Sequence, residues 1–221
     1  MTQSAEVSAP RPVRLNLAGY VLNGDLTLPS NAIGLVIFAH GSGSSRHSAR
    51  NRSVAEVLHR GGLATLLLDL LTEDEERVDA VTAEFRFDTS LLADRLVDAI
   101  DWSEAHPDLA SLRIGLFGAS TGAAAALIAA ARRTGAVRAV VSRGGRPDLA
   151  EQSLAAVVAP TLLIVGGNDE VVVEINQRVF ERLKQPKALE IVPGATHLFE
   201  EAGALEHVAQ LAATWFGQYL G

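Results

Sequence analysis

Cysteine is absent from this 221-residue chain, which excludes a disulfide framework, a thiolate metal site and a cysteine nucleophile. Long apolar runs are missing too, since none approaches the roughly 18 residues that a membrane-spanning helix requires. Basic residues are outnumbered, with 19 lysines and arginines against 26 acidic residues, and the formal net charge of −7 disfavours nucleic acid as a partner. We therefore expect no nucleic-acid partner and no association with a membrane.

The first residues of the chain contribute little to a fold. Met1 to Pro12 is polar, contains prolines and lacks the apolar stretch of a secretory signal peptide. We expect residues 1–11 to form a loose tail and the protein to be cytoplasmic. Residues 12–221 have the length of one domain with a substantial core, and they contain no linker, internal repeat or low-complexity tract.

Apolar patterns along the chain predict an α/β protein. Residues 13–28 alternate between apolar and polar side chains, with turn signals at Gly19 and at Asn23-Gly24, which indicates two short antiparallel strands. Beyond them, continuous apolar runs typical of doubly buried strands alternate with helical segments, so we expect a mostly parallel sheet with helices on both faces. Residues 70–88 are acidic and are expected to be irregular. The predicted strands are 34–39, 63–68, 113–117, 137–141, 161–165 and 189–192, and the predicted helices are 51–60, 88–106, 123–131, 147–158, 172–183 and 202–219.

Residues 118–122 read Gly-Ala-Ser-Thr-Gly and stand between a predicted strand and a predicted helix. A turn this tight brings Gly118 and Gly122 nearly into contact and strains residue 120, and glycine tolerates the crowding. The start of the helix directs free N–H groups and the positive end of its dipole toward whatever the Ser120 hydroxyl attacks. The pattern is that of the G-x-S-x-G nucleophile elbow. A glycine-rich turn without a catalytic role is the alternative, and the ends of the other strands have to decide between the two.

A serine hydroxyl needs a base to take its proton, and the base needs an acid to orient it. In a parallel sheet the active site lies beyond the carboxyl ends of the strands. His197 follows the last predicted strand and Asp169 follows the one before it, so both are expected on the same rim as Ser120. Glu170 is the second candidate acid. The structural alternatives are an Asx turn at Asp169 and a capping role for His197.

Acyl transfer also needs two backbone N–H donors that hold the oxyanion. Thr121, directly after the nucleophile, is expected to supply one. Ser42 is expected to supply the other, because Gly41 and Gly43 let this loop approach the reacting atoms closely. The loop lacks the Gly-Lys-Ser/Thr of a P-loop and the third glycine of a dinucleotide fingerprint. His40, at its start, is expected to brace the loop rather than to act as a second base.

Four short segments, each different, together form a recognisable set of motifs. They are His40–Gly43, Gly118–Gly122, Gly167–Asp169 and Gly194–His197. Together they resemble the α/β-hydrolase superfamily and, within it, the small dienelactone-hydrolase-like branch. The resemblance implies an α/β-hydrolase fold of about eight strands, a triad in the chain order Ser120, Asp169, His197, hydrolysis through an acyl-enzyme, and no cofactor or metal. The chain departs from dienelactone hydrolase proper, which uses a cysteine nucleophile, so we do not expect dienelactone to be its specific substrate. Residues 142–148 leave no room for the lid domain of many lipases.

The surroundings of the reacting atoms are less well determined by the sequence. Arg143 follows a central strand on the rim and is a candidate ligand for a substrate carboxylate. Pairing of Arg143 with Asp148 or with the acidic residues 73–76 is favoured, because surface arginines usually have such partners. Phe85 and Phe87 either form an apolar wall of the pocket or pack beneath their own loop.

The expected activity is hydrolysis of small carboxylic esters, lactones or thioesters by Ser120. The same triad suits an acyltransferase, an amidase or a peptidase, and a non-catalytic binding protein on this fold is a further alternative. A haloalkane dehalogenase is disfavoured, because the elbow carries serine where that chemistry needs a carboxylate. The expected partner is a small ester-type molecule. The protein is expected to be a monomer, or a homodimer that pairs through an exposed edge strand at 188–192.

Overall fold

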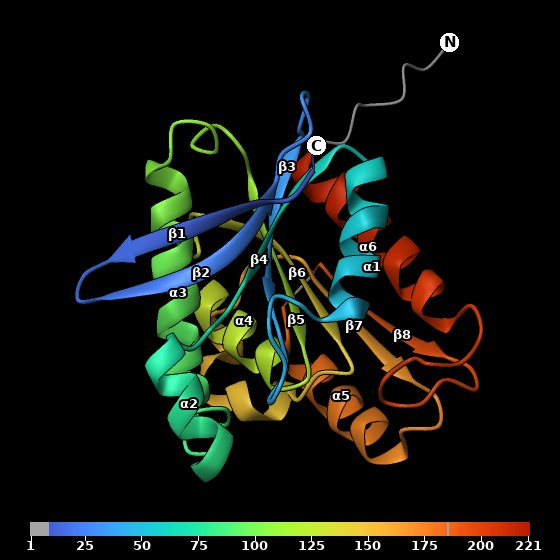
Figure 1. The fold of residues 1–221 in the computed structure, drawn as a ribbon. Helices are drawn as coiled ribbons and strands as arrows, with labels where there is room; N and C mark the ends of the chain where they lie inside the picture. Colours follow the sequence, from blue (N-terminus) through green and yellow to red (C-terminus); the bar gives the residue numbers. More distant parts are fainter. Residues whose placement is uncertain (1–8, 185) are drawn as a thin grey trace.

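A single eight-stranded sheet runs through the molecule, as the computed structural model shows for residues 9–184 and 186–221 (Figure 1). In spatial order its strands are β1 (Arg11–Leu17), β2 (Tyr20–Thr27), β4 (Leu63–Leu68), β3 (Gly34–Ala39), β5 (Ile114–Ala119), β6 (Val137–Arg143), β7 (Thr161–Gly166) and β8 (Lys187–Val192). β2 is antiparallel to both of its neighbours, and every other neighbouring pair is parallel. The mostly parallel sheet is confirmed, and β8 is an edge strand.

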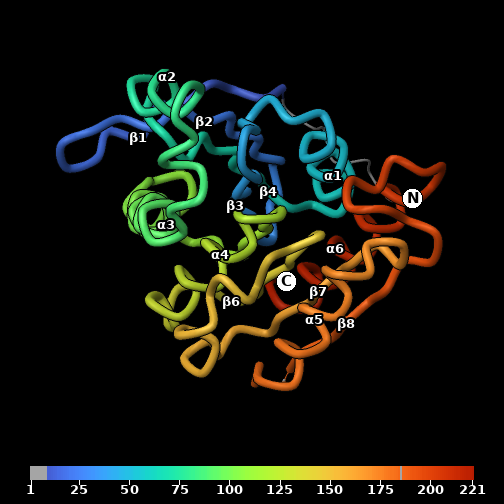
Figure 2. Tube along the Cα trace, turned by 90° about the horizontal axis from the view of Figure 1, so that it is seen from below, coloured from blue at the N-terminus to red at the C-terminus, as the bar shows by residue number. Residues whose placement is uncertain are grey.

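Helices cover both faces of the sheet (Figure 2). α1 and α6 pack together on one face, while α3, α4, α5 and the 3₁₀ helix η1 pack on the other. Strands β3, β4, β5 and β7 are buried at every position, which is the reason for their continuous apolar runs. No helix in the described part of the chain combines the length and apolarity needed to cross a membrane. The helices are α1 (Ala49–Arg60), α2 (Glu73–Thr82), α3 (Thr89–Ala105), α4 (Thr121–Arg132), η1 (Pro147–Ala156), α5 (Glu170–Arg182) and α6 (Ala204–Leu220).

The order of the strands reverses at β3, and this reversal creates the place for a site. The chain passes from β3 to β4 on one side and later returns to β5 on the other side of β3. The loops that follow β3 and β5 therefore leave the sheet in different directions, and a crevice opens between them at the carboxyl ends of the strands. The register pairs Ala39 with Gly118, so the loop that begins at His40 lies beside the elbow.

Residues 70–88 contain a helix, so the prediction of an irregular segment is wrong for their first half. The hydroxyl of Thr72 accepts a hydrogen bond from the Glu75 N–H (3.2 Å), and the Glu75 carboxylate accepts one from the Thr72 N–H (2.8 Å). This reciprocal capping box starts α2 on an acidic sequence with little apolar periodicity. Asp79 lies within α2, and its buried carboxylate accepts hydrogen bonds from the N–H groups of Phe85 (2.8 Å) and Arg86 (2.9 Å), which follow the helix. These bonds fold the irregular second half back onto the helix.

The turn predicted at Asn23-Gly24 is also wrong, because both residues lie inside β2. The hairpin turns instead at Gly19, whose φ of 96° favours glycine. Gly24 pairs with β1 on one side and with β4 on the other, and a Cβ atom there would lie 2.9 Å from Cδ1 of Leu66. β1 begins at Arg11, the last residue of the expected tail, while residues 1–8 lie outside the described part of the chain.

Replacing Gly122 by alanine is expected to lower the free energy of unfolding by about 3 kcal/mol. A Cβ atom at Gly122 would lie 2.4 Å from the carbonyl oxygens of both Ala39 and His40. These are backbone atoms at the end of the central strand β3, so relieving the clash would require the strand or the helix to shift. Gly217→Ala is the matched control, because a Cβ atom there, in the last turn of α6, meets no atom within 4 Å. That variant is expected to gain about 0.5–1 kcal/mol from helix propensity. Urea unfolding of both variants checks the pair, and equal stability of the two would contradict the packing argument.

Candidate active site

Ser120 lies at the junction of β5 and α4 in a backbone conformation that side chains rarely adopt. Its φ and ψ angles are 51° and −119°. The end of β6 and the loop after it hold this residue: the Ser120 N–H donates to the Arg143 carbonyl (3.2 Å), and the Arg146 N–H donates to the Ser120 carbonyl (3.1 Å). A Cβ atom at Gly118 would lie 2.4 Å from Cα of Ala123. The strained turn between strand and helix therefore has the geometry that residues 118–122 predict.

His197 and Asp169 meet at the same end of the sheet. Nδ1 of His197 lies 2.7 Å from Oδ2 of Asp169, and their side chains are 39% and 18% exposed. Their loops are joined, since the N–H of Asn168 donates to the Ala195 carbonyl (2.9 Å). Glu170 is exposed at the first position of α5 and makes no contact of this kind with the ring. The structure thus brings the histidine to Asp169 and not to Glu170.

Ser120 and His197 line one cavity of about 220 Å³ at the carboxyl ends of the strands. The backbone between β6 and η1 separates their loops and passes very close to the histidine. Gly144 has φ 52°, and a Cβ atom on it would lie 3.1 Å from the His197 carbonyl oxygen and 3.6 Å from Cε1 of the ring. A glycine at 144 therefore lets the β6 loop support the serine without displacing the imidazole.

The loop after β3 lies directly against Ser120. A Cβ atom at Gly41 would be 3.2 Å from Cβ of Ser120, and Ser42 lines the same cavity. Thr121 is the first residue of α4, where a backbone N–H has no partner within the helix. Within the described residues, neither the Ser42 nor the Thr121 N–H donates to a protein acceptor. The two predicted oxyanion donors are thus close to Ser120 and available to a ligand.

His40 braces this loop from behind. Its Nε2 atom accepts a hydrogen bond from the Leu70 N–H (3.1 Å), and its Nδ1 atom lies 2.9 Å from the Gly41 carbonyl, to which it donates. Both partners have fixed roles, so the ring is neutral with its proton on Nδ1. Burial lowers the pKa of His40, which also favours the neutral form. The bracing role predicted for His40 agrees with these contacts.

Arg143 does not form the ion pairs that the sequence favours for it. The Asp148 carboxylate pairs with Arg146 instead (2.9 and 2.7 Å), and Arg143 makes no ion pair with any described residue. Its side chain is only 7% exposed and lines the cavity beside Ser120. The favoured pairing is wrong because Arg143 is the last residue of β6 and the sheet directs its side chain into the crevice, whereas Arg146 lies past the turn next to Asp148.

The two phenylalanines do not form a wall of this cavity. Phe85 is half-buried and packs against the core that lies between the sheet and α3, while Phe87 is exposed. Neither of them lines the cavity that contains Ser120. The Asp79 carboxylate folds their loop back onto α2, a restraint that the sequence pattern did not reveal.

Sequence reasoning missed Arg50, which lines the cavity beside Arg143. It lies in the first turn of α1, two residues after the N-cap Ser48. Its Nη1 atom lies 3.3 Å from Oε1 of Glu200, on the opposite rim. No motif marks this position, and its approach to Arg143 depends on how α1 packs against α6 and β4.

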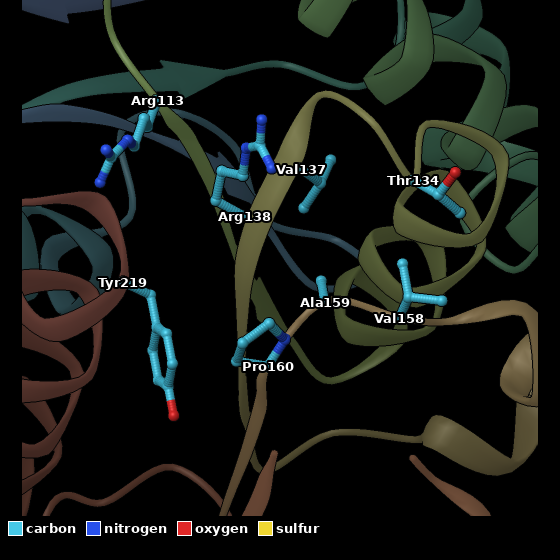
Figure 3. Close-up of a pocket in the computed structure, with 8 residues that line it drawn as sticks. All are labelled: Arg113, Thr134, Val137, Arg138, Val158, Ala159, Pro160 and Tyr219. Atoms are coloured by element: carbon cyan, nitrogen blue, oxygen red, sulfur yellow. The ribbon is translucent and has the colours of Figure 1, made fainter. Parts of the chain in front are cut away.

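A second hollow lies at the opposite end of the strands (Figure 3). Its volume is about 420 Å³, larger than that of the cavity at Ser120. The eight lining residues include no acid, histidine or serine, and several of them precede a strand instead of following one. Size alone therefore does not locate the chemistry, because the reactive groups gather at the smaller cavity. The hollow is lined by Arg113, Thr134, Val137, Arg138, Val158, Ala159, Pro160 and Tyr219.

Comparison with known families agrees with this geometry. The family model described as the dienelactone hydrolase family matches residues 22–220, nearly the whole chain. The chain belongs to the dienelactone hydrolase family. A crystal structure of dienelactone hydrolase from Anabaena variabilis shares 56% sequence identity with it, covering 96% of this chain and 99% of that one with a TM-score of 0.95. The fold is therefore the α/β-hydrolase fold, with only Gly144, Gly145 and Arg146 between β6 and η1 and hence no lid domain there.

Two further similar proteins say less about the function of this chain. Est1E from Butyrivibrio proteoclasticus has the same fold at 18% identity, with a TM-score of 0.79 over 94% of this chain and 98% of that one. A protein of Mycobacterium tuberculosis named "Putative phosphoribosyl transferase" is 61% identical over 197 residues, which are 89% of this chain and 44% of that protein. The chain thus spans less than half the length of this curated relative, whose name describes a different chemistry.

Proposed function

We propose that this member of the dienelactone hydrolase family is a serine hydrolase that cleaves small carboxylic esters, lactones or thioesters through an acyl-enzyme. One observation carries the proposal. His197 forms a hydrogen bond with the partly buried carboxylate of Asp169 (2.7 Å), and it lines the same cavity as Ser120, whose backbone has the strained conformation of an elbow. A hydroxyl, a base and an orienting acid are the parts that acyl transfer to serine requires.

The proposed reaction follows from the atoms in the cavity. Oγ of Ser120 attacks the carbonyl carbon, and Nε2 of His197 takes the hydroxyl proton. The Asp169 carboxylate accepts the Nδ1–H bond of the ring, which holds the tautomer with a free Nε2 and stabilises the imidazolium. The N–H groups of Ser42 and Thr121 bind the oxyanion. His197 then protonates the leaving alcohol, and water repeats the sequence on the acyl-enzyme.

The geometry also supports a limit on substrate size. The cavity of about 220 Å³ is small, and no lid domain follows β6 to enclose a long chain. Small or short-acyl esters fit such a site better than long-chain lipids. A cytoplasmic location, the absence of a cofactor, and a monomeric or homodimeric state stay predictions.

Labelling of the purified protein with a fluorophosphonate tests the proposed function. Wild type is expected to gain one covalent phosphonyl group, mapped by peptide mass spectrometry to Ser120, and to hydrolyse short 4-nitrophenyl esters in parallel. Prior incubation with such an ester should delay labelling, because the acyl-enzyme occupies the same oxygen. A protein that neither labels nor hydrolyses esters would favour the non-catalytic alternative.

Acyl transfer to another acceptor is the second candidate, since the same three residues serve an acyltransferase, an amidase or a peptidase. Hydrolysis of an ester in the presence of added alcohols, amines and thiols separates these activities. Release of acid alone is expected for a hydrolase. A dominant ester, amide or thioester product would instead assign the chain to acyl transfer.

A further inference from the structure

A buried asparagine of α5 holds the loop between β6 and η1. The side chain of Asn176 is 0% exposed, and its Nδ2 atom donates to the carbonyls of Gly145 (3.0 Å) and Val172 (2.8 Å). Two carbonyl acceptors fix the orientation of this amide, because its oxygen in the same place would face two other oxygens. The bond to Val172 stays within α5, and the bond to Gly145 ties α5 to the loop.

Gly145 lies between the two loop residues that reach Ser120 and His197. On one side of it, the Arg146 N–H donates to the Ser120 carbonyl (3.1 Å). On the other side, a Cβ atom at Gly144 would lie 3.1 Å from the His197 carbonyl oxygen and 3.6 Å from Cε1 of the ring. The position of Gly145 therefore affects the surroundings of both side chains.

The loop has little room on the side of α4. A Cβ atom at Gly145 would lie 2.7 Å from Cβ of Ala123 in that helix. The start of the loop is held from β7, since the Gly144 N–H donates to the Ile164 carbonyl (2.8 Å). Packing thus opposes a movement of Gly145 toward α4, and the bond from Asn176 opposes a movement away from α5.

The same helix carries the carboxylate that contacts the histidine. Asp169 is the N-cap of α5, and its Oδ2 atom lies 2.7 Å from Nδ1 of His197. Asn176 follows seven residues later, which is about two turns, so the two side chains lie on the same face of the helix. One rigid element therefore holds the histidine at its start and the loop behind Ser120 two turns further on.

We propose that Asn176 is a positioning residue that fixes the place of Ser120 relative to the Asp169–His197 pair by tying α5 to the loop after β6. It acts through Gly145 and touches no reacting atom. Its effect on the reaction rate rests on the proposed function, whereas its effect on the loop does not. Proton transfer needs the hydroxyl and the imidazole within hydrogen-bond distance, and a misplacement of about 1 Å costs roughly 100-fold in rate.

The kinetic test uses two substitutions of similar size. Asn176→Leu removes both donors, and Asn176→Asp turns carboxylate oxygens toward the two carbonyls. Each is expected to lower kcat for 4-nitrophenyl acetate and the rate constant of fluorophosphonate labelling by about 100-fold. KM should stay within about twofold of wild type, because neither Asn176 nor Gly145 lines the cavity at Ser120.

Val179→Ala is the matched control, three residues further along α5. Val179 is buried in the core cluster of that face, so the substitution leaves a cavity and lowers the urea midpoint. Its kcat is expected to stay within about twofold of wild type. If Asn176→Leu lost no more activity than Val179→Ala, with both variants folded in the assay, Asn176 would have a structural role only.

Amide hydrogen exchange followed by NMR tests the loop without catalysis. In Asn176→Leu the N–H groups of Ser120 and Arg146 are expected to exchange about 10-fold faster or more, while that of Ile37 in β3 keeps its wild-type rate. Faster exchange of both groups, in a protein whose wild type neither labels nor hydrolyses esters, would overturn the proposed function and leave the hold on the loop in place. Unchanged exchange at Ser120 and Arg146, or unchanged kcat in an active enzyme, would overturn the positioning role.

Discussion

Ser120→Ala is expected to lower kcat for short 4-nitrophenyl esters by about 10⁵-fold or more and to abolish fluorophosphonate labelling. The substitution removes only Oγ, the atom that forms the acyl bond. The backbone of residue 120 stays where it is, because its N–H and carbonyl are held by the loop after β6 at 3.2 and 3.1 Å. The loss is thus expected without a change in the cooperative unfolding transition, and rates measured beside a urea unfolding curve check both points.

Ser111→Ala is the matched control for this variant. Ser111 is exposed and precedes β5, so it lies at the opposite end of the strand that carries Ser120. Wild-type rates and full labelling are expected for it. If Ser120→Ala labelled as well as wild type, the nucleophile would be a different residue and the assignment of Ser120 would be wrong.

Asp169→Asn is expected to lower kcat by about 10⁴-fold while KM changes little. The carboxylate accepts the Nδ1–H bond of His197 at 2.7 Å, which leaves Nε2 free to take the serine proton. An asparagine that turns its amide N–H groups toward Nδ1 favours the opposite tautomer, in which Nε2 carries a proton and no longer serves as the base. The fold is expected to persist, because asparagine has nearly the size and shape of aspartate.

Glu170→Gln provides the comparison for the acid, since Glu170 is the neighbouring carboxylate and the second candidate in the sequence. It is exposed at the start of α5 and makes no hydrogen bond to the ring, so the rate is expected to stay within about twofold of wild type. Steady-state rates over a range of ester concentrations separate kcat from KM for both variants. A large loss in Glu170→Gln with little loss in Asp169→Asn would transfer the role to Glu170.

The apolar patterns and the turn residues of the sequence were enough to predict the class of fold. Apolar runs such as 34–39 and 63–68 predict strands that are buried on both faces, and these bounds are confirmed. The errors fall where local hydrogen bonds outweigh the pattern. α2 forms because Thr72 and Glu75 cap it reciprocally, and an acidic helix with one half-buried face leaves little periodicity to detect.

In the candidate site, too, some features could be predicted from the sequence and others could not. Ser120, Asp169 and His197 each follow a strand that the sequence predicts, and a parallel sheet collects all strand ends on one rim. Their approach is therefore readable from strand order alone. The partner of an arginine is not readable in this way, because guanidinium pairs form between side chains whose distance depends on packing. Both Arg143 and Arg146 are near Asp148 in the sequence. Arg146 forms the ion pair, because Arg143 is the last residue of β6 and Arg146 lies beyond the end of the strand.

The sequence by itself determined the class of fold, the elbow and the three residues proposed for catalysis, because strand ends and glycine turns are properties of local chain segments. Only the tertiary structure decided what surrounds them. It placed α1 so that Arg50 stands beside Arg143, and it excluded carboxylates from the lining of their cavity. The charge that a substrate meets is the sum over residues far apart in the chain, and no local pattern records that sum.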